Sequence, residues 1–189
     1  FCGTRGVGKT SMARIFARAV NVSDQQAEEA AVGDAILRGE DMDVVEIDGA
    51  SNNGVQDARD LIANASIRPA RSPFKIYIID EVHMLSNAAF NALLKTMEEP
   101  PSHVKFILCT TEPHKVLPTI QSRCQRFDFR PISVSRIAAH LTSVLASESI
   151  DAEESVVLRV ARLANGSMRD GLSILERVVA AADGRLDAA

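Results

Sequence analysis

Apolar positions along the first two thirds of the chain follow two alternating kinds of spacing. Short continuous runs rich in β-branched residues are typical of buried strands, and apolar residues at three- to four-residue spacing are typical of amphipathic helices. Strands are predicted at 43–48, 74–79 and 104–109, with an edge strand at 125–129. Helices are predicted at 10–20, 24–37, 54–66 and 87–98, the last with Ser86 as its N-cap. Because strands alternate with helices, the pattern predicts an α/β fold with a mainly parallel sheet and helices on both faces.

The pattern changes near Pro131, after which the chain has no strand-like run. Three helical segments follow, at 133–147, 151–164 and 168–182. Asp151 with Glu154, and Ser167 with Asp170, have the spacing of N-cap pairs that satisfy backbone N–H groups in the first turn of a helix. We therefore predict a core domain over residues 1–131 and a small all-helical domain over residues 132–189.

Composition narrows the class of protein. The chain has 189 residues, of which 46% are apolar and 24% charged, so a disordered or fibrous protein is excluded. Aromatic residues make up only 4%, which speaks against a stacking platform for single-stranded nucleic acid. No apolar run approaches the roughly 20 residues that span a bilayer, and we expect no signal peptide. Three cysteines without framework spacing indicate a reduced, cytoplasmic protein.

The net charge of −4 is unevenly distributed. Residues 24–48 hold nine of the 25 acidic side chains and one of the 21 basic ones, and we interpret this stretch as a solvated face. The remainder is mildly positive, which permits a polyanionic partner without requiring one.

A glycine-rich loop near the start of the chain fits the phosphate-loop pattern G-x-x-x-x-G-K-[ST]. It consists of Gly3, Thr4, Arg5, Gly6, Val7, Gly8, Lys9 and Thr10, followed by Ser11 in the predicted helix. Glycines let successive backbone N–H groups face a polyphosphate, Lys9 can reach the β- and γ-phosphates, and the Thr10 hydroxyl can ligate Mg²⁺. Such a loop normally follows a buried strand, so we expect that strand to lie upstream and the chain to be a fragment.

An acidic pair, Asp80 and Glu81, follows the predicted strand 74–79. Alone, such a pair is more often a polar turn. Because it comes 71 residues after Lys9 of a phosphate loop, the catalytic interpretation is favoured. Asp80 is predicted to hold Mg²⁺ through water, and Glu81 to act as the base that polarises the attacking water.

Other polar residues are ambiguous in the sequence. Thr110 and Thr111 follow the strand 104–109, where a hydroxyl could orient the lytic water or simply end the strand. Arg123 and Arg169 could each pair with phosphate through the planar guanidinium group, although an ordinary surface arginine is the commoner explanation. The cysteines and histidines lack the paired spacing of metal ligands, so no zinc site is predicted.

The chain resembles the AAA+ clamp-loader ATPases, and among them the gamma/tau family. Besides the phosphate loop, the similar segments are 46–51 (EIDGAS), 78–85 (IIDEVHML), 90–101 (FNALLKTMEEPP), 109–113 (CTTEP), 122–124 (SRC) and 166–170 (GSMRD). The resemblance covers almost the whole chain and implies an AAA+ core followed by a helical lid, with ATP and Mg²⁺ as ligands. It further implies that Thr111 is the sensor-1 residue, Arg123 an arginine finger reaching the adjacent subunit's nucleotide, and Arg169 the sensor-2 arginine of the lid.

One segment departs from the family. Members of the gamma/tau family usually insert a four-cysteine zinc module after the first helix. In this chain the matching residues, 21–43, contain no cysteine. The acidic, alanine-rich stretch takes the place of that module, and zinc is not carried over.

The resemblance implies an ATP-hydrolysing motor subunit that loads a sliding clamp onto primed DNA in the cytoplasm. Its expected partners are other clamp-loader subunits (delta, delta prime and further gamma/tau copies), the clamp and primed DNA. The alternatives are a non-hydrolysing structural subunit, another AAA+ motor such as a branch-migration ATPase, and a small-molecule phosphate-loop kinase. Intact Lys9, Thr10, Asp80 and Glu81 argue against the structural subunit, and the Ser-Arg-Cys motif argues against the other motors.

Overall fold

The computed structural model describes residues 1–22 and 27–181, which divide into two compact units. The first unit contains residues 1–2 and 9–128, and the second contains residues 3–8 together with the chain from residue 129 onward. The sequence predicted domains over residues 1–131 and 132–189. These domain limits remain a prediction, because the compact units are a different kind of division.

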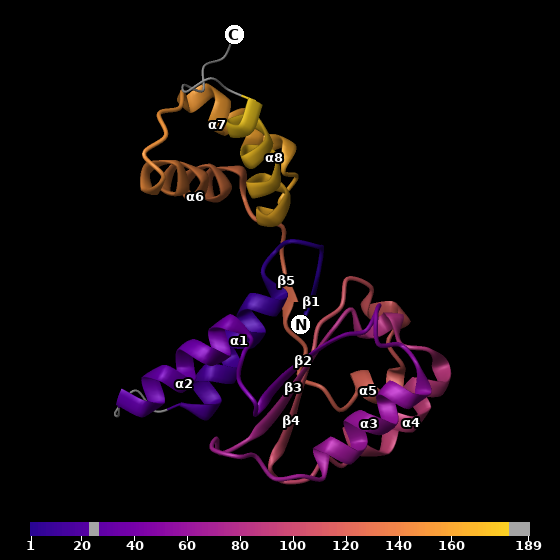
Figure 1. Cartoon of the computed structure of the whole chain (residues 1–189). Coiled ribbons are helices and arrows are strands. Elements are labelled where there is room, and N and C mark those ends of the chain that lie inside the picture. The colour runs from indigo at the N-terminus through magenta and orange to yellow at the C-terminus, as the bar shows by residue number, and fades with distance from the viewer. Residues whose placement is uncertain (23–26, 182–189) are drawn as a thin grey trace. The chain divides into compact units, whose positions relative to one another are not determined.

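A parallel sheet forms the centre of the first unit (Figure 1). Its longer strands are β2 (Val44–Asp48), β3 (Lys75–Asp80) and β4 (Val104–Leu108), in the order β2-β3-β4. The register places Asp48 opposite Asp80 and Ile79 opposite Leu108. The carboxyl ends of the three strands therefore meet at one edge of the sheet, as the predicted parallel arrangement requires.

Two short strands, β1 (Cys2–Gly3) and β5 (Asp128–Phe129), pair with each other. Cys2 also forms a parallel bridge with Thr110, just beyond β4, and the backbone N–H of Thr110 donates to the Phe1 carbonyl at 3.0 Å. The expectation that the strand before the phosphate loop lies wholly upstream was therefore wrong for its last residues. Two or three residues are too few to produce a recognisable apolar run in the sequence.

Successive side chains of β3 pack on opposite faces of the sheet, because side chains alternate along a strand. Ile76 and Ile78 pack in the cluster that includes α1 (Lys9–Asn21) and α2 (Ala27–Arg38). Tyr77 and Ile79 pack in the cluster that includes α3 (Val55–Ala65) and α4 (Asn87–Glu98). Figure 1 shows the two helix pairs on either side of the sheet. The predicted α/β fold with helices on both faces is confirmed.

The N-cap residue predicted from the sequence placed the start of α4 correctly. Ser86 is the N-cap of α4, and its Oγ accepts a hydrogen bond from the Ala89 N–H at 3.2 Å. The short helices η1 (Val82–Met84), η2 (Pro113–Lys115) and α5 (Pro118–Gln121) complete the first unit. The helix predicted at 24–37 corresponds to α2, and the part of that prediction over residues 24–26 lies outside the described residues.

The second unit contains α6 (Val134–Ser147), α7 (Glu154–Leu163) and α8 (Met168–Ala181). These helices correspond to the three helical segments predicted from the sequence. Ile137, Leu141 and Leu175 are among the buried residues of its core. Residue 182, included in the last predicted helix, lies outside the described residues.

The two predicted N-cap pairs of this unit had different outcomes. Ser167 does accept a hydrogen bond from the Asp170 N–H, at 3.2 Å. The prediction for Asp151 was wrong, because Glu153 occupies the N-cap position of α7 and makes no side-chain cap. A three-residue spacing between acids is common in polar loops, so it does not specify the register of a helix start.

The buried carboxylate of Asp43 anchors the loop that leads into β3. It is 2% exposed and accepts hydrogen bonds from the backbone N–H groups of Ala70 at 2.7 Å and of Arg71 and Ser72 at 2.9 Å. Burial by itself would raise the pKa of Asp43, but these backbone donors hold it below its usual value.

We expect Asp43→Ala to lower the free energy of unfolding by about 3 kcal/mol at pH 7, because it leaves three backbone donors without their acceptor. A carboxylate whose pKa is depressed by folding contributes stability above its unfolded pKa of about 3.9 and loses it as the pH falls through the folded value. Urea unfolding should therefore show the difference from wild type shrinking below about pH 4. The exposed Asp60→Ala is the control, with an expected change within about 0.5 kcal/mol; an equal effect of the two substitutions would contradict this account.

Within the described ranges, no helix is both long and apolar enough to cross a membrane.

Candidate active site

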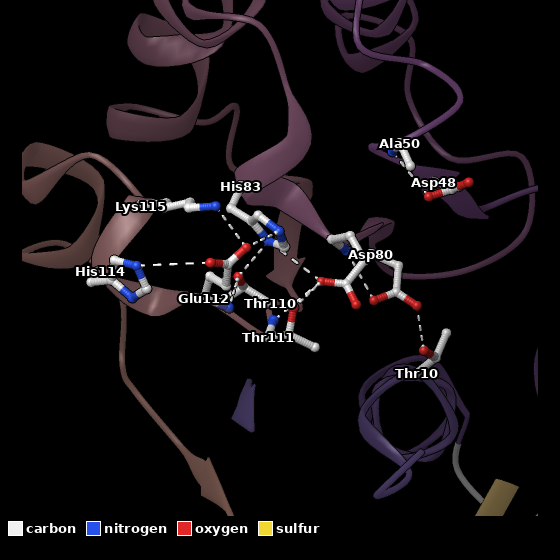
Figure 2. A network of polar contacts seen from close by, with 11 residues as sticks. Thr10, Asp48, Ala50, Asp80, His83, Thr110, Thr111, Glu112, His114 and Lys115 are labelled. Carbon is white, nitrogen blue, oxygen red and sulfur yellow. Dashed lines mark hydrogen bonds and ion pairs between the residues drawn. The ribbon is translucent and has the colours of Figure 1, made fainter. Parts of the chain in front are cut away.

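The carboxyl edge of the sheet brings the phosphate-loop helix and the acidic pair together (Figure 2). Thr10 lies in the first turn of α1, and its Oγ1 donates a hydrogen bond to Asp80 Oδ2 at 2.7 Å. Asp80 Oδ1 accepts the backbone N–H of Glu81 at 2.9 Å. Two oxygen-bearing side chains that lie 70 residues apart in the sequence thus share one position at the end of β3.

This pair suits a magnesium ion. Mg²⁺ prefers hard oxygen ligands and usually binds through one or two protein groups together with water and substrate phosphates. The Thr10 hydroxyl and the Asp80 carboxylate provide such groups, and they lie within hydrogen-bond distance of each other. Both residues predicted as metal ligands are therefore placed where one ion could contact both.

The chain turns sharply after Asp80. Glu81 has left-handed backbone angles, with φ 45° and ψ 46°, which are uncommon for a residue with a side chain and tend to occur at functional sites. Gly49, directly after β2, donates its N–H to the Asp80 carbonyl at 2.8 Å. A Cβ at Gly49 would lie 2.7 Å from the Glu81 carbonyl oxygen, so only glycine allows β2 to approach this turn.

The Glu81 carboxylate is held by the residue that follows β4. Its Oε2 accepts hydrogen bonds from the Thr111 hydroxyl at 2.9 Å and from the Thr111 N–H at 3.1 Å. The parallel pairing of β3 with β4 explains this contact, because it brings the ends of the two strands side by side. Of the two threonines that the sequence left ambiguous, Thr111 is the one that contacts the predicted base.

The phosphate-loop residues fall in both units. Lys9, which is 6% exposed, begins α1 in the first unit and is followed there by Thr10 and the exposed Ser11. The preceding residues belong to the second unit: Gly3, Thr4, Arg5, Gly6, Val7 and Gly8.

Gly6 contacts the start of α8 within the second unit. Its carbonyl accepts a hydrogen bond from the Met168 N–H at 2.9 Å. Gly6 has a φ of 74°, and a Cβ there would collide with Ser167 Oγ. A side chain at this position is therefore incompatible with the observed packing.

The two predicted arginines lie in different units. The side chain of Arg123 is 54% exposed, and its Nε lies 3.6 Å from Glu98 Oε1. Arg169 is exposed near the start of α8 in the second unit. Their roles as arginine finger and sensor 2 stay predictions that rest on the resemblance.

No cluster of three or more His, Cys, Asp or Glu side chains that could hold a metal ion occurs among the described residues. Cys109 is fully buried, and burial, together with the negative charge of Asp80, raises the pKa of its thiol to about 12. A thiol that stays protonated is a poor metal ligand and a poor nucleophile. The absence of zinc from residues 21–43 stays a prediction.

Three further polar residues at this edge were not identified from the sequence as a group. The ring of His83 lies close to Glu112 and Thr110 (Figure 2). Its Nδ1 also lies 3.4 Å from Glu81 Oε2. His83 belongs to the family-like segment 78–85, but no sequence spacing connects it with residues 110 and 112. Only the pairing of β3 with β4 brings them together.

Two family models match the chain. The model described as DNA polymerase III, delta subunit, matches residues 1–133, and the model described as DNA polymerase III clamp loader subunit, ATPase lid domain, matches residues 136–184. The chain is 50% identical over 183 residues to DNA polymerase III subunit tau of Bacillus subtilis, a match that covers 95% of the chain and 32% of that protein. It is 47% identical over 190 residues to the Escherichia coli subunit tau, with 98% and 30% covered.

A third relative is the DNA polymerase III subunit gamma of Buchnera aphidicola from Acyrthosiphon pisum, 42% identical over 98% of the chain and 52% of that protein. The chain thus spans 30–52% of the length of these relatives. Among solved structures, the RuvB Holliday junction branch migration motor of Thermotoga maritima is similar, with a TM-score of 0.69 and 18% identity over 98% of the chain and 56% of that structure. At this identity the likeness shows a shared AAA+ fold, as the sequence predicted, and not a shared activity.

Proposed function

Since the chain belongs to the DNA polymerase III clamp-loader family, we propose that it is the ATP-hydrolysing part of a clamp-loader motor subunit. The observation that carries this proposal is the continuous set of contacts from Thr10 through Asp80 and Glu81 to Thr111 at one edge of the sheet. A phosphate loop, a metal-binding carboxylate, a base and a polar residue beside that base are the groups that phosphoryl transfer to water requires.

The chain's own residues divide the work of hydrolysis. Lys9 and the loop from Gly3 to Gly8 bind the phosphates of ATP, while Thr10 and Asp80 hold Mg²⁺. That ion would supply positive charge to the phosphate oxygens during transfer. Glu81 takes a proton from the attacking water as the water oxygen bonds to the γ-phosphorus and the bond to the leaving ADP oxygen breaks. Thr111 fixes the Glu81 carboxylate beside the reacting atoms.

Two arginines of this chain act in the assembled clamp loader. Arg123 stabilises the transferring phosphoryl group in a neighbouring subunit, and Arg169 contacts the γ-phosphate of its own nucleotide. The partners are delta, delta prime and further gamma/tau subunits, the sliding clamp and primed DNA, all in the cytoplasm. The subunit itself does not polymerise DNA, although it acts within a polymerase holoenzyme.

Steady-state ATP hydrolysis by the full-length protein in its clamp-loader assembly, with and without sliding clamp and primed DNA, tests the proposal. We expect clamp and primed DNA together to stimulate hydrolysis. A complex that loads clamps normally while this subunit hydrolyses no ATP would instead support the non-hydrolysing structural role.

Lys9→Ala should weaken nucleotide binding by about 10- to 100-fold, because a hydrogen bond to a charged group contributes about 1.5–3 kcal/mol. Lys9 is the cation that the G-x-x-x-x-G-K-[ST] pattern specifies, whereas Arg5, the other cation of the loop, stands at one of its unspecified positions. Titration of the full-length protein with a fluorescent ATP analogue measures the affinity. The exposed Lys95→Ala is the matched control, and unchanged affinity in Lys9→Ala would refute the assignment of the loop.

A further inference from the structure

The imidazole of His83 is buried beside the proposed base. Its side chain is 5% exposed, and it lies in η1, two residues after Glu81. A buried imidazole needs partners for both ring nitrogens. Nδ1 lies 2.9 Å from Thr110 Oγ1, and Nε2 lies 3.2 Å from Glu112 Oε2.

His83 also approaches the Glu81 carboxylate. Nδ1 lies 3.4 Å from Glu81 Oε2, the same oxygen that accepts both hydrogen bonds from Thr111. Three protein groups thus surround Oε2, while Oε1 has no hydrogen-bond partner among the residues that the structure describes. The arrangement fixes one oxygen of the carboxylate and leaves the other available to a water molecule.

Glu112 orients the imidazole from its opposite side. Its carboxylate also receives Lys115 Nζ at 2.9 Å, and that contact is the main reason why the pKa of Glu112 lies below its usual value. Glu112 therefore remains charged and continues to attract the Nε2 side of the ring. A histidine held at one nitrogen by a carboxylate presents its other nitrogen in a fixed direction.

We propose that His83 is a positioning residue for hydrolysis: its ring carries an N–H on each nitrogen, donates from Nε2 to Glu112, and through the N–H at Nδ1 holds the Glu81 carboxylate with Oε1 toward the attacking water. The inference rests on the proposed function, because it assumes that Glu81 is the base. Loss of a group that orients a reacting side chain typically lowers activity by about 10- to 100-fold, since small displacements of a base reduce proton transfer strongly. The ordinary alternative is a buried histidine whose contacts matter only for packing.

Two amide substitutions separate these roles. In His83→Asn the amide lies close to the position of Nδ1, facing Thr110 and Glu81. In His83→Gln the longer side chain places the amide close to the position of Nε2, facing Glu112. If His83 acts through Nδ1, Asn should retain most of the turnover, whereas Gln should lower kcat about tenfold or more with little change in KM.

The experiment measures kcat and KM for ATP in the full-length protein assembled with its clamp-loader partners, clamp and primed DNA. His83→Asn and His83→Gln are compared with wild type, with Glu81→Gln, and with His103→Asn as a matched control. His103 is also partly buried, but its ring contacts the Ala65 carbonyl at 3.1 Å, away from the acidic pair. Thermal unfolding and nucleotide titration report whether each variant folds and binds ATP.

The expected result is an active wild type, an inactive Glu81→Gln, near-normal His83→Asn and His103→Asn, and a His83→Gln that binds ATP normally but turns over slowly. Equal kcat values for the two His83 variants would overturn the positioning role, as would failure of both to fold, while leaving the proposed function intact. If Glu81→Gln kept the wild-type rate, or the wild type hydrolysed no ATP, the proposed function itself would fail and this inference with it.

Discussion

Arg123→Ala is expected to leave each subunit's own nucleotide affinity nearly unchanged and to lower hydrolysis in the assembled complex by about 10³–10⁵-fold at the affected site. An arginine supplied by a neighbouring subunit stabilises the negative charge that develops on the phosphoryl oxygens during transfer. The position of Arg123 is compatible with such a role, because its side chain is 54% exposed and its contact with Glu98 is a loose one of 3.6 Å. A surface ion pair of this kind contributes about 0–1 kcal/mol, so the guanidinium can be redirected at little cost.

A mixing experiment decides whether Arg123 acts on a neighbour. Complexes are assembled in which one subunit alone carries Arg123→Ala, and the activity of each nucleotide site is followed separately. We expect the loss at the adjacent subunit's site; loss confined to the mutant's own site would rule out action in trans.

Arg126→Ala is the matched control for that experiment. Arg126 is exposed to a similar extent, 52%, lies three residues further along the chain, and pairs with Asp128 at 2.8 Å. Removing it changes the surface charge by the same amount, so an equal loss of activity in the two variants would point to a general effect of charge.

Glu81→Gln is expected to keep ATP binding and to lower kcat by about 10²–10⁴-fold. The glutamine carbonyl can take the position of Oε2 and accept both hydrogen bonds from Thr111. The amide NH₂ then occupies the position of Oε1, where it cannot accept a proton from water. The side chain thus keeps its shape and anchoring contacts and loses only its function as a base, so ATP should trap the clamp-bound complex.

Single-turnover hydrolysis and nucleotide titration of the assembled complex measure the two steps separately. Glu99→Gln, an exposed change of the same chemical kind, should behave like the wild type. Hydrolysis by Glu81→Gln at close to the wild-type rate would show that another group is the base.

The sequence by itself determined the order and type of the longer helices and strands in both units, but it did not predict β1 or the short helices η1, η2 and α5. The apolar run of β3 marks a strand buried on both faces, and Ser86 marks the first turn of α4 to the residue. These features are readable because they depend on neighbours within a few positions, through the period of side chains along a strand and through backbone donors at a helix start. The phosphate loop and the acidic pair are readable for the same reason, since each motif is contiguous.

Tertiary structure alone decided how the functional side chains are paired. The pattern of residues alone left the role of the threonines after β4 open, and only the family resemblance pointed to Thr111; in the structure Thr111 contacts Glu81 and Thr110 contacts His83. Nor did the sequence connect His83 with Glu112, or explain why Gly49 must lack a side chain. These contacts join residues about 30 positions apart, and they exist because β3 lies beside β2 and β4 in one particular parallel register. A shift of one residue in that register would turn the side chains to the opposite faces and separate the base from its partners, which no local pattern of residues encodes.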